Sequence, residues 1–517
     1  MTHREHKMYR FSEAPIWELQ RAYYEEQGIT AWQSGDVPQY ITSNRVMAIS
    51  YAETVFGFLQ DRARIGQLTA SVMILELGAG SGQFAFYVLQ ELTKLTQQAR
   101  ILLPPFRYVM SDLAEKNIAF WRQHTCLRPY VEQGVLDFAK FDAVHHSEIY
   151  LQHAGERIVS GDLTQPLVIM ANYFFDSLPQ ELIYIEDHQV YDCQISLQFP
   201  DRAHELSVSQ QLKEVVGSYH YQRENRYDDE SYPYRELLHV YRQHISDSHV
   251  LMPEVGLACL NRLKALSREG FLLLTADKGD HRLESWEYNE PPKLIHHGSI
   301  SLTANYHAIS YICEAQGGQA LFTKHPYTYL NIGCMLNLSE PNQYGLTRLA
   351  YDRFVERFGP DDFFNLKEAF DTQVEQKTMP QLLALWRLSG YDTQFLLPCT
   401  KRLIELIPDS MDHEWSALQQ GIDHMWAHYY PMDGNTDVAL ACGILLYQMD
   451  MYQEAIPYFE RTQPNLDNDA TVLYEMAVCY YELGQDDAAR RYVERTISQS
   501  PAHEEAIALR ELLFSMR

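Results

Sequence analysis

The residues with the clearest chemical potential form a short glycine-rich loop after an apolar run. In VMILELGAGSGQFAFYVLQEL (72–92), Glu76 stands two residues before Gly78, and Gly80 and Gly82 follow at alternate positions. Glycine tolerates positive φ angles and lets a backbone approach a ligand closely. Gln83 stands where the dinucleotide-binding pattern G-x-G-x-x-G has its third glycine or alanine. The loop therefore predicts a ligand cradle that is not a dinucleotide site.

Three carboxylates follow or end successive predicted strands. Glu76 would repel a pyrophosphate but attract an ammonium group, and S-adenosylmethionine carries an ammonium and no phosphate. Asp112, in FRYVMSDLAEKN (106–117), can accept hydrogen bonds from both ribose hydroxyls. Asp137, in VEQGVLDFAKFDA (131–143), is expected to end a third short strand, in reach of an adenine amino group. Each carboxylate alone is typical of a solvated strand end, but the series predicts a pocket for S-adenosylmethionine.

An α/β domain is needed to bring these residues together. Between residues 71 and about 345, apolar runs alternate with helix-periodic stretches, as in a largely parallel sheet with crossover helices. The predicted fold class is therefore α/β, with a Rossmann-like sheet. Its strands are expected at 72–77, 107–111, 167–171, 270–276 and 327–336.

Two further segments flank or interrupt this pattern. Residues 1–70 are predicted to be helical and polar, with a loop-rich insert at 33–44 that serves as a lid. Between about 195 and 265 the alternation lapses, and SYHYQRENRYDDESYPYRELLHVYRQH (218–244) is rich in tyrosine and charge. We interpret this stretch as an inserted helical cap that lies over the acceptor entrance with the lid.

The run after the fourth strand resembles a known family signature. Asn172-Tyr173-Phe174-Phe175-Asp176-Ser177-Leu178-Pro179 is similar to N-E-x-x-D-A-x-P of the MidA-like methyltransferases. Other family motifs are matched in order by Ala22-Tyr23-Tyr24, Gly35-Asp36, Ile41-Thr42-Ser43, Phe56-Gly57, 270–280 and 301–309. The family consists of class I S-adenosylmethionine enzymes and includes a mitochondrial complex I assembly factor that methylates a protein arginine. The resemblance, over roughly 20–345, implies that fold and that cofactor.

The acceptor side departs from the family pattern. Tyr173 stands in place of the family's glutamate, and the family's D-Y-G is Asp277-Lys278-Gly279 here. The family's D-L-T-A-H-V-D is changed at several positions within 301–307. Methyl-donor binding is therefore implied more directly than an arginine acceptor.

These motifs yield two sets of candidate site residues. Asp176, Tyr173 and Glu181 are expected to meet the acceptor, because a cationic arginine is held bidentately by carboxylates. Asp176 can equally be the N-cap of a helix or turn that begins near Ser177. The residues expected to bind the donor are Glu76, Gly78, Ala79, Gly80, Gly82, Asp112, Leu113, Asp137, Phe138, Asn172, Thr42 and Ser43.

The C-terminal third, residues 360–517, is helix-periodic and contains a repeat. Segments 439–464 and 473–501 align at an offset of 34 residues, so that Gly443 matches Ala477 and Ala455 matches Ala489. Small residues at this period resemble the tetratricopeptide helix–turn–helix, with turns expected near Asp450 and Gly484. Helical hairpins at about 362–430 are expected to extend the array, and its concave face to bind a peptide or protein. The alternative is a helical bundle in which the small residues only pack the core.

Composition excludes several classes of protein. The 517 residues are 46% hydrophobic and 21% charged, which is typical of globular domains and not of a disordered chain. The net charge of −27 disfavours nucleic acid as a partner. No apolar run is long enough for a membrane span or an export signal. Scattered cysteines, and histidine pairs such as His145-His146 and His296-His297, predict a cytoplasmic protein without a metal site.

The sequence favours a methyltransferase whose acceptor is a protein side chain presented with the help of the C-terminal helices. Two alternatives remain open at this stage. One is a catalytically weak S-adenosylmethionine-binding scaffold used in complex assembly, which the changed acceptor-side motifs allow. The other is a methyltransferase of small molecules, which a tyrosine-rich segment closing a small dry pocket would favour.

Overall fold

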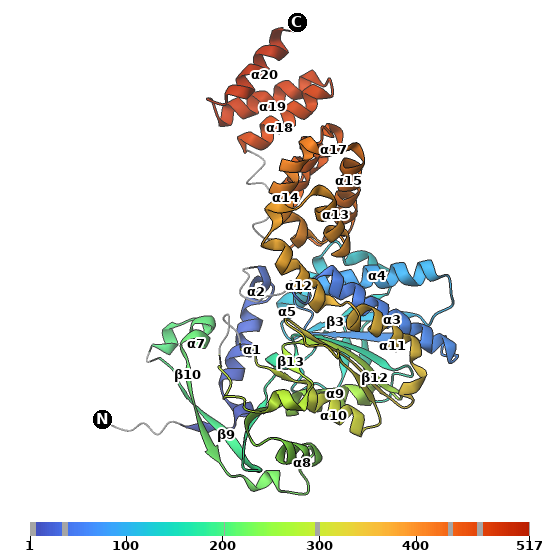
Figure 1. Cartoon of the computed structure of the whole chain (residues 1–517), viewed down its shortest axis with the longest axis vertical. Coiled ribbons are helices and arrows are strands. Elements are labelled where there is room, and N and C mark those ends of the chain that lie inside the picture. The colour runs from blue at the N-terminus through green and yellow to red at the C-terminus, as the bar shows by residue number, and fades with distance from the viewer. Residues whose placement is uncertain are drawn as a thin grey trace. The chain divides into compact units, whose positions relative to one another are not determined.

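The computed structural model describes residues 7–33, 40–200, 202–294, 300–432, 438–462 and 469–515. The chain divides into two compact units, Met1–Asn365 and Leu366–Arg517 (Figure 1). Residues 1–70 belong to the first unit and contribute helices α1 (Ile16–Gln27), α2 (Thr30–Gln33) and α3 (Arg45–Arg64). Among the described residues, no helix is both long and apolar enough to cross a membrane.

The first unit is built on a seven-stranded sheet with the order β15-β16-β12-β7-β2-β3-β4. β2 pairs in parallel with β3 on one side and with β7 on the other, whereas β16 runs antiparallel to β12. β3 and β4 extend the sheet on one side of β2, and β7 and β12 extend it on the other. The strand order therefore reverses beside β2, and ligands bind at the carboxyl ends of the strands at such a point in open α/β sheets. The strands are β2 (Val72–Leu77), β3 (Phe106–Asp112), β4 (Leu136–Lys140), β7 (Leu167–Asn172), β12 (Gly270–Asp277), β15 (Gln319–Leu321) and β16 (Asn331–Leu338).

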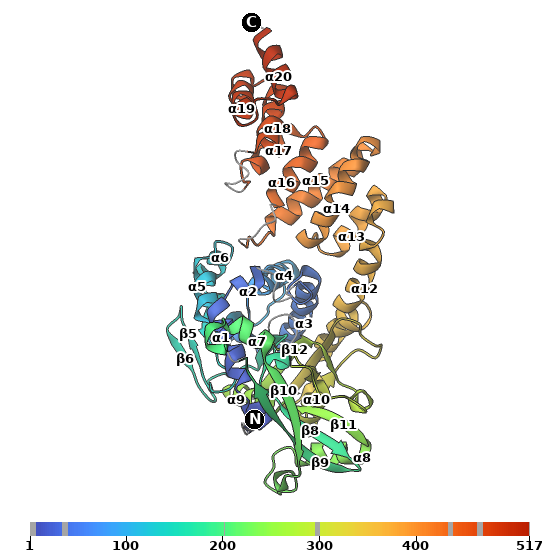
Figure 2. The same ribbon diagram turned by 90° about the vertical axis from the view of Figure 1, so that its left-hand side faces the viewer.

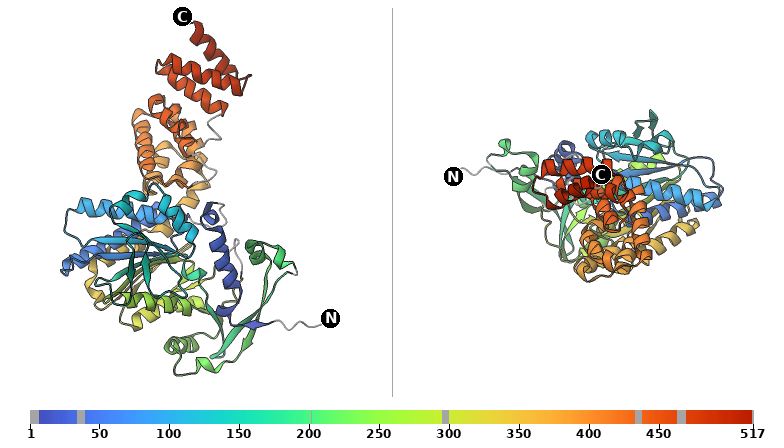
Figure 3. Two further views of the ribbon diagram at one scale, coloured as in Figure 1. Left: turned by 180° about the vertical axis from the view of Figure 1, so that it is seen from behind. Right: turned by 90° about the horizontal axis from the view of Figure 1, so that it is seen from above.

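Helices cover both faces of this sheet (Figures 1 and 3). On one face α3 packs against α4 (Gln83–Ala99) and α11 (Gly345–Tyr351). On the other lie α9 (Glu254–Leu266) and α10 (Tyr306–Ala315), which contact strands of the sheet. β2 and β12 are buried along their whole length, as expected for strands covered on both sides. The predicted α/β sheet is confirmed.

The inserted segment 195–265 is not the helical cap predicted from the sequence. It contributes part of β9 (Gln189–Gln198), then β10 (Val216–Gln222) and β11 (Asp247–Met252), to an antiparallel sheet with β1 (Met8–Tyr9) and β8 (Glu181–Glu186) (Figure 2). The tyrosines of 218–222 lie on β10, where Tyr219 stands opposite Ile195. Aromatic side chains suit a strand when a partner strand is present. The helices in the insert are α7 (Val208–Glu214), α8 (Arg235–His244) and the first part of α9.

The second unit is helical over its described residues. Its helices are α13 (Met379–Leu388), α14 (Thr393–Leu406), α15 (Asp412–Ala427), α16 (Val438–Gln448), α17 (Tyr452–Phe459), α18 (Ala470–Glu482), α19 (Asp486–Gln499) and α20 (Glu504–Ser515). α12 (Pro360–Asp371) crosses the boundary between the two units.

The predicted 34-residue repeat corresponds to two helical hairpins, α16–α17 and α18–α19. Asp450 and Gly484, at equivalent positions, turn the chain with φ of 56° and 68°. Gly443 lets the helices of its hairpin approach closely, because a Cβ there would lie 2.8 Å from Cδ1 of Phe459. The equivalent Ala477 is fully buried. The small residues therefore set the distance between paired helices.

Candidate functional site

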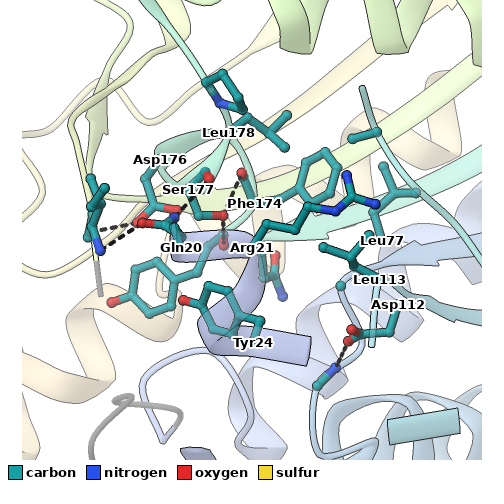
Figure 4. A pocket seen from close by; sticks show the side chains of 18 of the residues that line it. Gln20, Arg21, Tyr24, Leu77, Asp112, Leu113, Phe174, Asp176, Ser177 and Leu178 are labelled. Atoms are coloured by element: carbon teal, nitrogen blue, oxygen red, sulfur yellow. Dashed lines mark hydrogen bonds between the residues drawn. The ribbon is translucent and has the colours of Figure 1, made fainter. Parts of the chain in front are cut away.

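A cavity of about 600 Å³ opens at the carboxyl ends of the central strands of the first unit. Four segments form most of its wall: the β2–α4 loop, the residues after β3, the residues after β7 and helix α1. Figure 4 shows Asp112 and Asp176 at separate ends, with Gln20, Arg21 and Tyr24 of α1 beside them. Its size is that of a site for one small ligand and part of a second.

The glycine loop forms one end of the cavity. Gly78, Gly80 and Gly82 have φ angles of 67°, 53° and 80°, which residues other than glycine rarely adopt. A Cβ added at Gly80 would lie 2.9 Å from Cζ2 of Trp32. Gly78, Ala79 and Gly80 therefore present bare backbone toward the cavity, as a cradle for a ligand requires, whereas Gly82 directly precedes α4 and does not line the cavity.

Glu76 lies at the base of this loop and is 6% exposed. The hydroxyl of Tyr108 donates a hydrogen bond of 2.9 Å to its Oε2. Burial raises the pKa of Glu76 to about 8, against the lowering effect of the Tyr108 hydrogen bond, and the charge of Asp112 raises it further. A buried carboxyl group of this kind is stabilised in its charged form by an incoming cation.

This environment predicts a pH-dependent affinity for the donor. We expect the affinity for S-adenosylmethionine to rise by up to about tenfold per unit between pH 6 and 7.5, because an ammonium group near Glu76 favours loss of its proton. Calorimetry in two buffers of different protonation enthalpy measures the released proton. Glu76→Gln should bind more weakly and release none. Binding without proton release in the wild type would contradict this role of Glu76.

Asp112 is held at the end of β3 by two backbone N–H groups. Gly80 donates to its Oδ2 at 3.1 Å, and Ala114 donates to its Oδ1 at 2.9 Å. Each oxygen keeps a lone pair that can accept a further hydrogen bond. Burial raises the pKa of Asp112, while these backbone hydrogen bonds lower it. Asp112 and Leu113 both line the cavity, as predicted.

The prediction for Asp137 and Phe138 is wrong. β4 begins at Leu136 and ends at Lys140, so Asp137 lies near its start. Its carboxylate accepts hydrogen bonds from the backbone of Phe138, His153 and Ala154 and does not line the cavity. The residues that line the cavity after β4 are Phe141, Asp142, Ala143, Val144 and His145. The second aspartate of the same segment therefore stands at the strand end.

Three further residues that were predicted to bind S-adenosylmethionine lie on the cavity wall. Thr42 and Ser43 precede α3, and Asn172 ends β7. The hydroxyl of Tyr51, on α3, donates to Oδ1 of Asn172 at 2.7 Å and so fixes the orientation of its amide.

Asp176 lies at the other end of the cavity and is 3% exposed. Ser301 Oγ donates to its Oδ2 at 2.7 Å, and its own backbone N–H donates to Oδ2 of Asp277 at 3.1 Å. Oδ1 of Asp176 is buried and has no hydrogen-bond partner among the described residues. Burial raises the pKa of Asp176 to about 6, against the lowering effects of Ser301 and Lys278. Burial and Asp176 together raise the pKa of Asp277.

Tyr173 also lines this end, in a strained conformation. Its φ is 46°, which is unusual for an aromatic residue and is typical of functional loops. Its backbone N–H donates to the Ala276 carbonyl at 2.9 Å, and its hydroxyl has no hydrogen-bond partner among the described residues. Burial raises the pKa of Tyr173.

The prediction that Glu181 meets the acceptor is wrong. Glu181 begins β8 and does not line the cavity. Its Oε1 accepts hydrogen bonds from Arg10 and from Ser12, and Arg226 lies 3.8 Å away. Burial raises the pKa of Glu181 to about 7, against the effects of Ser12 and Arg10. This carboxylate ties the N-terminal segment to the antiparallel sheet.

Sequence reasoning missed most of the residues that α1 and α2 contribute. Arg21 forms an ion pair of 2.7 Å with Asp142, and the other contributors are Trp17, Glu18, Gln20, Tyr24 and Trp32. The only available signal was the apolar stripe of a helix, which predicts burial without saying against what. Lys278, Ser301 and Thr303, which come from two later loops, were also missed as site residues.

Two predicted features fall partly outside the described residues. These are the lid at 33–44, of which residues 34–39 are not described, and the pair His296-His297. Within the described ranges, no group of three or more His, Cys, Asp or Glu residues could hold a metal ion.

Comparison with known proteins agrees with this geometry. Residues 58–291 match the family model described as "Putative S-adenosyl-L-methionine-dependent methyltransferase", and residues 433–513 match the model of the tetratricopeptide repeat. Searching the curated proteins gave no match.

Two solved structures from Burkholderia thailandensis are similar at low identity. One is an uncharacterised protein, 14% identical, which covers 61% of this chain and 73% of its own, with a TM-score of 0.38. The second, a member of the same superfamily bound to S-adenosyl-homocysteine, is 14% identical and covers 54% and 64%, with a TM-score of 0.35.

The matched residues include the glycine loop, Asp112 and Asp176, whereas α1 and residues 300–303 complete the cavity from outside the match. The glycine cradle, the buried Glu76 and the Asp112 carboxylate suit the ammonium and ribose of S-adenosylmethionine. Residues 58–291 are therefore similar to S-adenosyl-L-methionine-dependent methyltransferases, and residues 433–513 are similar to the tetratricopeptide repeat.

Proposed function

We propose that this protein transfers a methyl group to a nitrogen of a protein side chain, with arginine favoured. When bound, S-adenosylmethionine supplies a methyl group on a positively charged sulfur. Glu76 would bind its ammonium group, the loop of Gly78, Ala79 and Gly80 would hold its methionine part, and Asp112 would bind its ribose. These residues orient the donor and keep water away from it, which is the main contribution of the protein to such a displacement.

The observation that carries the acceptor assignment is the unpaired Oδ1 of Asp176. A buried carboxylate oxygen without a partner is unfavourable unless a ligand supplies a donor. Asp277 holds the backbone of Asp176 from behind and does not line the cavity, so Asp176 is the carboxyl group that this end presents, with Lys278 also on the wall. A buried carboxylate favours a cation with several N–H groups, and a guanidinium group has five. The resemblance to MidA-like enzymes supports the same acceptor.

The acceptor nitrogen must lose a proton as it gains the methyl group. Asp176 can take that proton, because its raised pKa of about 6 makes it a better base than an ordinary aspartate. A guanidinium ion bound against it lowers that pKa and keeps the carboxyl group charged until methyl transfer. The methylated product keeps its positive charge, and the proton passes from Asp176 to water.

The repeat unit supports a polypeptide acceptor. Residues 437–517 contain 14 Asp and Glu against 6 Arg and no Lys. Tetratricopeptide arrays bind peptides on their concave face, and an acidic surface speeds encounter with a basic segment. We therefore propose that this unit recruits the protein acceptor.

The direct test uses the full chain and a radiolabelled methyl donor. Arginine-containing peptides should be labelled, whereas the same peptides with lysine in place of arginine should be labelled at least about tenfold less, because lysine cannot bind a carboxylate through two parallel N–H groups. Labelling of small molecules but of no peptide would support a small-molecule enzyme. Donor binding without labelling of any acceptor would support an assembly scaffold.

We predict that the two units contribute separately. A chain ending at residue 365 should keep its affinity for S-adenosylmethionine and its activity on a short arginine peptide, and lose most activity on a full-length protein acceptor. A cut near 345 is unsuitable, because it removes Thr347, whose N–H and hydroxyl both donate to Oδ2 of Asp61, and Asp361, which accepts hydrogen bonds from three backbone N–H groups, including that of Leu330. Calorimetry and labelling measure the two properties. If the shortened chain methylated a full-length protein as fast as the whole chain does, the second unit would not recruit the acceptor.

A further inference from the structure

Helix α1 reaches the acceptor end of the cavity through one buried side chain, Gln20. Its Nε2 donates to the carbonyl oxygen of Ser177 at 3.0 Å, and its Oε1 accepts from the N–H of Ile300 at 2.8 Å. The orientation of the amide is fixed, because the carbonyl can only accept and the N–H can only donate. Gln20 is 3% exposed, so neither partner has water as a ready substitute.

Both partners of Gln20 belong to the loops that hold Asp176. Ser177 follows Asp176 directly, and Ile300 precedes Ser301, whose hydroxyl donates to Oδ2 of Asp176. The N–H of Leu302 donates to the Asp176 carbonyl oxygen at 3.0 Å. Loss of the Gln20 amide would therefore release both loops that position this carboxylate.

The same helix also forms part of the donor end. Trp17, Arg21 and Tyr24 line the cavity, and Arg21 pairs with Asp142 after β4. Figure 4 shows Gln20 beside Asp176 and Ser177, with Arg21 and Tyr24 nearer to Leu113 and Asp112. A single helix of 12 residues thus contacts both subsites, and its side chains move together when it shifts.

We infer that Gln20 is a positioning residue. It couples the acceptor subsite to the position that α1 takes over the bound donor. Donor binding orders α1, and Gln20 then fixes the two loops that carry Asp176 and Ser301. The acceptor consequently binds after the donor. This inference rests on the proposed function, since it takes the Asp176 end of the cavity as the acceptor subsite.

The test measures hydrogen exchange in the full chain with S-adenosylhomocysteine as the probe. In the wild type, the probe should slow exchange of the amides of Ile300 and Leu302 by about tenfold or more, although both lie at the acceptor end. In Gln20→Met the probe should bind with affinity within about threefold of wild type but leave these amides unprotected. Gln27→Met, the same change at the end of α1, should behave as wild type.

A second variant separates positioning from simple loss of stability. In Gln20→Glu a carboxylate can accept from Ile300 but cannot donate to Ser177, whereas the protonated form can do both. Protection by the probe should therefore be weak at pH 8 and return toward wild type at pH 6, each compared with wild type at the same pH. The burial of this side chain raises the pKa of the introduced glutamate into that range.

The outcomes are distinct. Wild-type protection in Gln20→Met, or equal protection of Gln20→Glu at both pH values, would overturn the inference. Loss of probe binding in Gln20→Met would make Gln20 a donor-binding residue and would also overturn it. Failure of the proposed function has a different signature, because the wild type would then label no acceptor whatever its exchange pattern.

Discussion

Gly80→Val is expected to abolish donor binding. The native φ of 53° is strained for valine, by about 1–3 kcal/mol. The added Cβ would lie 2.9 Å from the indole of Trp32, and such overpacking adds about 1–3 kcal/mol. Relieving this contact must move the loop or Trp32, both of which line the cavity, so the affinity for S-adenosylmethionine should fall by about a hundredfold or more, at about 1.4 kcal/mol for each tenfold. Isothermal calorimetry with donor and with S-adenosylhomocysteine measures this loss.

Gly66→Val is the matched control for this prediction. Gly66 also has a positive φ, of 83°, but a Cβ there meets no atom within 4 Å. It therefore carries the same backbone strain without a contact near the cavity and should keep wild-type donor affinity. If Gly80→Val binds the donor as tightly as Gly66→Val does, the cavity is not the donor site.

Asp176→Asn is expected to reduce turnover by at least about a hundredfold, the usual range for a group that both binds a charge and accepts a proton. The amide keeps the shape of the side chain and can still accept from Ser301, but it can neither balance a cationic acceptor nor take its proton. The affinity for the donor should change by less than about threefold, because Asp176 lies at the far end of the cavity from Asp112.

The pH dependence of turnover tests the role of Asp176 in a second way. In the wild type at saturating donor, kcat/KM for the acceptor should rise with pH through about 6, because Asp176 acts in its ionised form and burial has raised its pKa to that value. Asp176→Asn should lack this rise. Asp352→Asn, the same change at an exposed position of the first unit, should keep both rate and profile. Equal turnover in Asp176→Asn and Asp352→Asn would leave Asp176 as a structural residue and remove the main support for an arginine acceptor.

Local sequence patterns determined the end of the cavity that the glycine loop forms, and they determined the repeat. The strand, glycine loop and helix at 72–92 fold as predicted because each rule involved acts over a few residues: apolar content for β2, positive φ for the glycines and helical periodicity for α4. The carboxylates of Glu76 and Asp112 then follow from the strand ends. The turns at Asp450 and Gly484 were likewise readable, because the repeat period places them at equivalent positions.

Tertiary structure decided what closes the cavity. Asp142, and not Asp137, follows the end of β4, because the strand begins later than its apolar residues suggest. Where the strand begins and ends depends on its pairing with β3. Glu181 leaves the site because Arg10, far away in sequence, reaches it. The tyrosines of β10 form a strand because β9 offers a partner. In each case the deciding contact joins segments distant in the chain.

The same reason explains why Gln20 could not be found from the sequence. Its two partners, Ser177 and Ile300, lie 157 and 280 residues away. A glutamine on the apolar side of a helix carries no local signal of what it will bind, and a buried amide is stable only when the folded chain brings it both a donor and an acceptor. The sequence by itself determined the glycine loop and the repeat, because local conformation and periodicity suffice for them. The helix that covers the cavity and the loops that hold Asp176 were decided only when the packed sheet brought distant segments within hydrogen-bond distance.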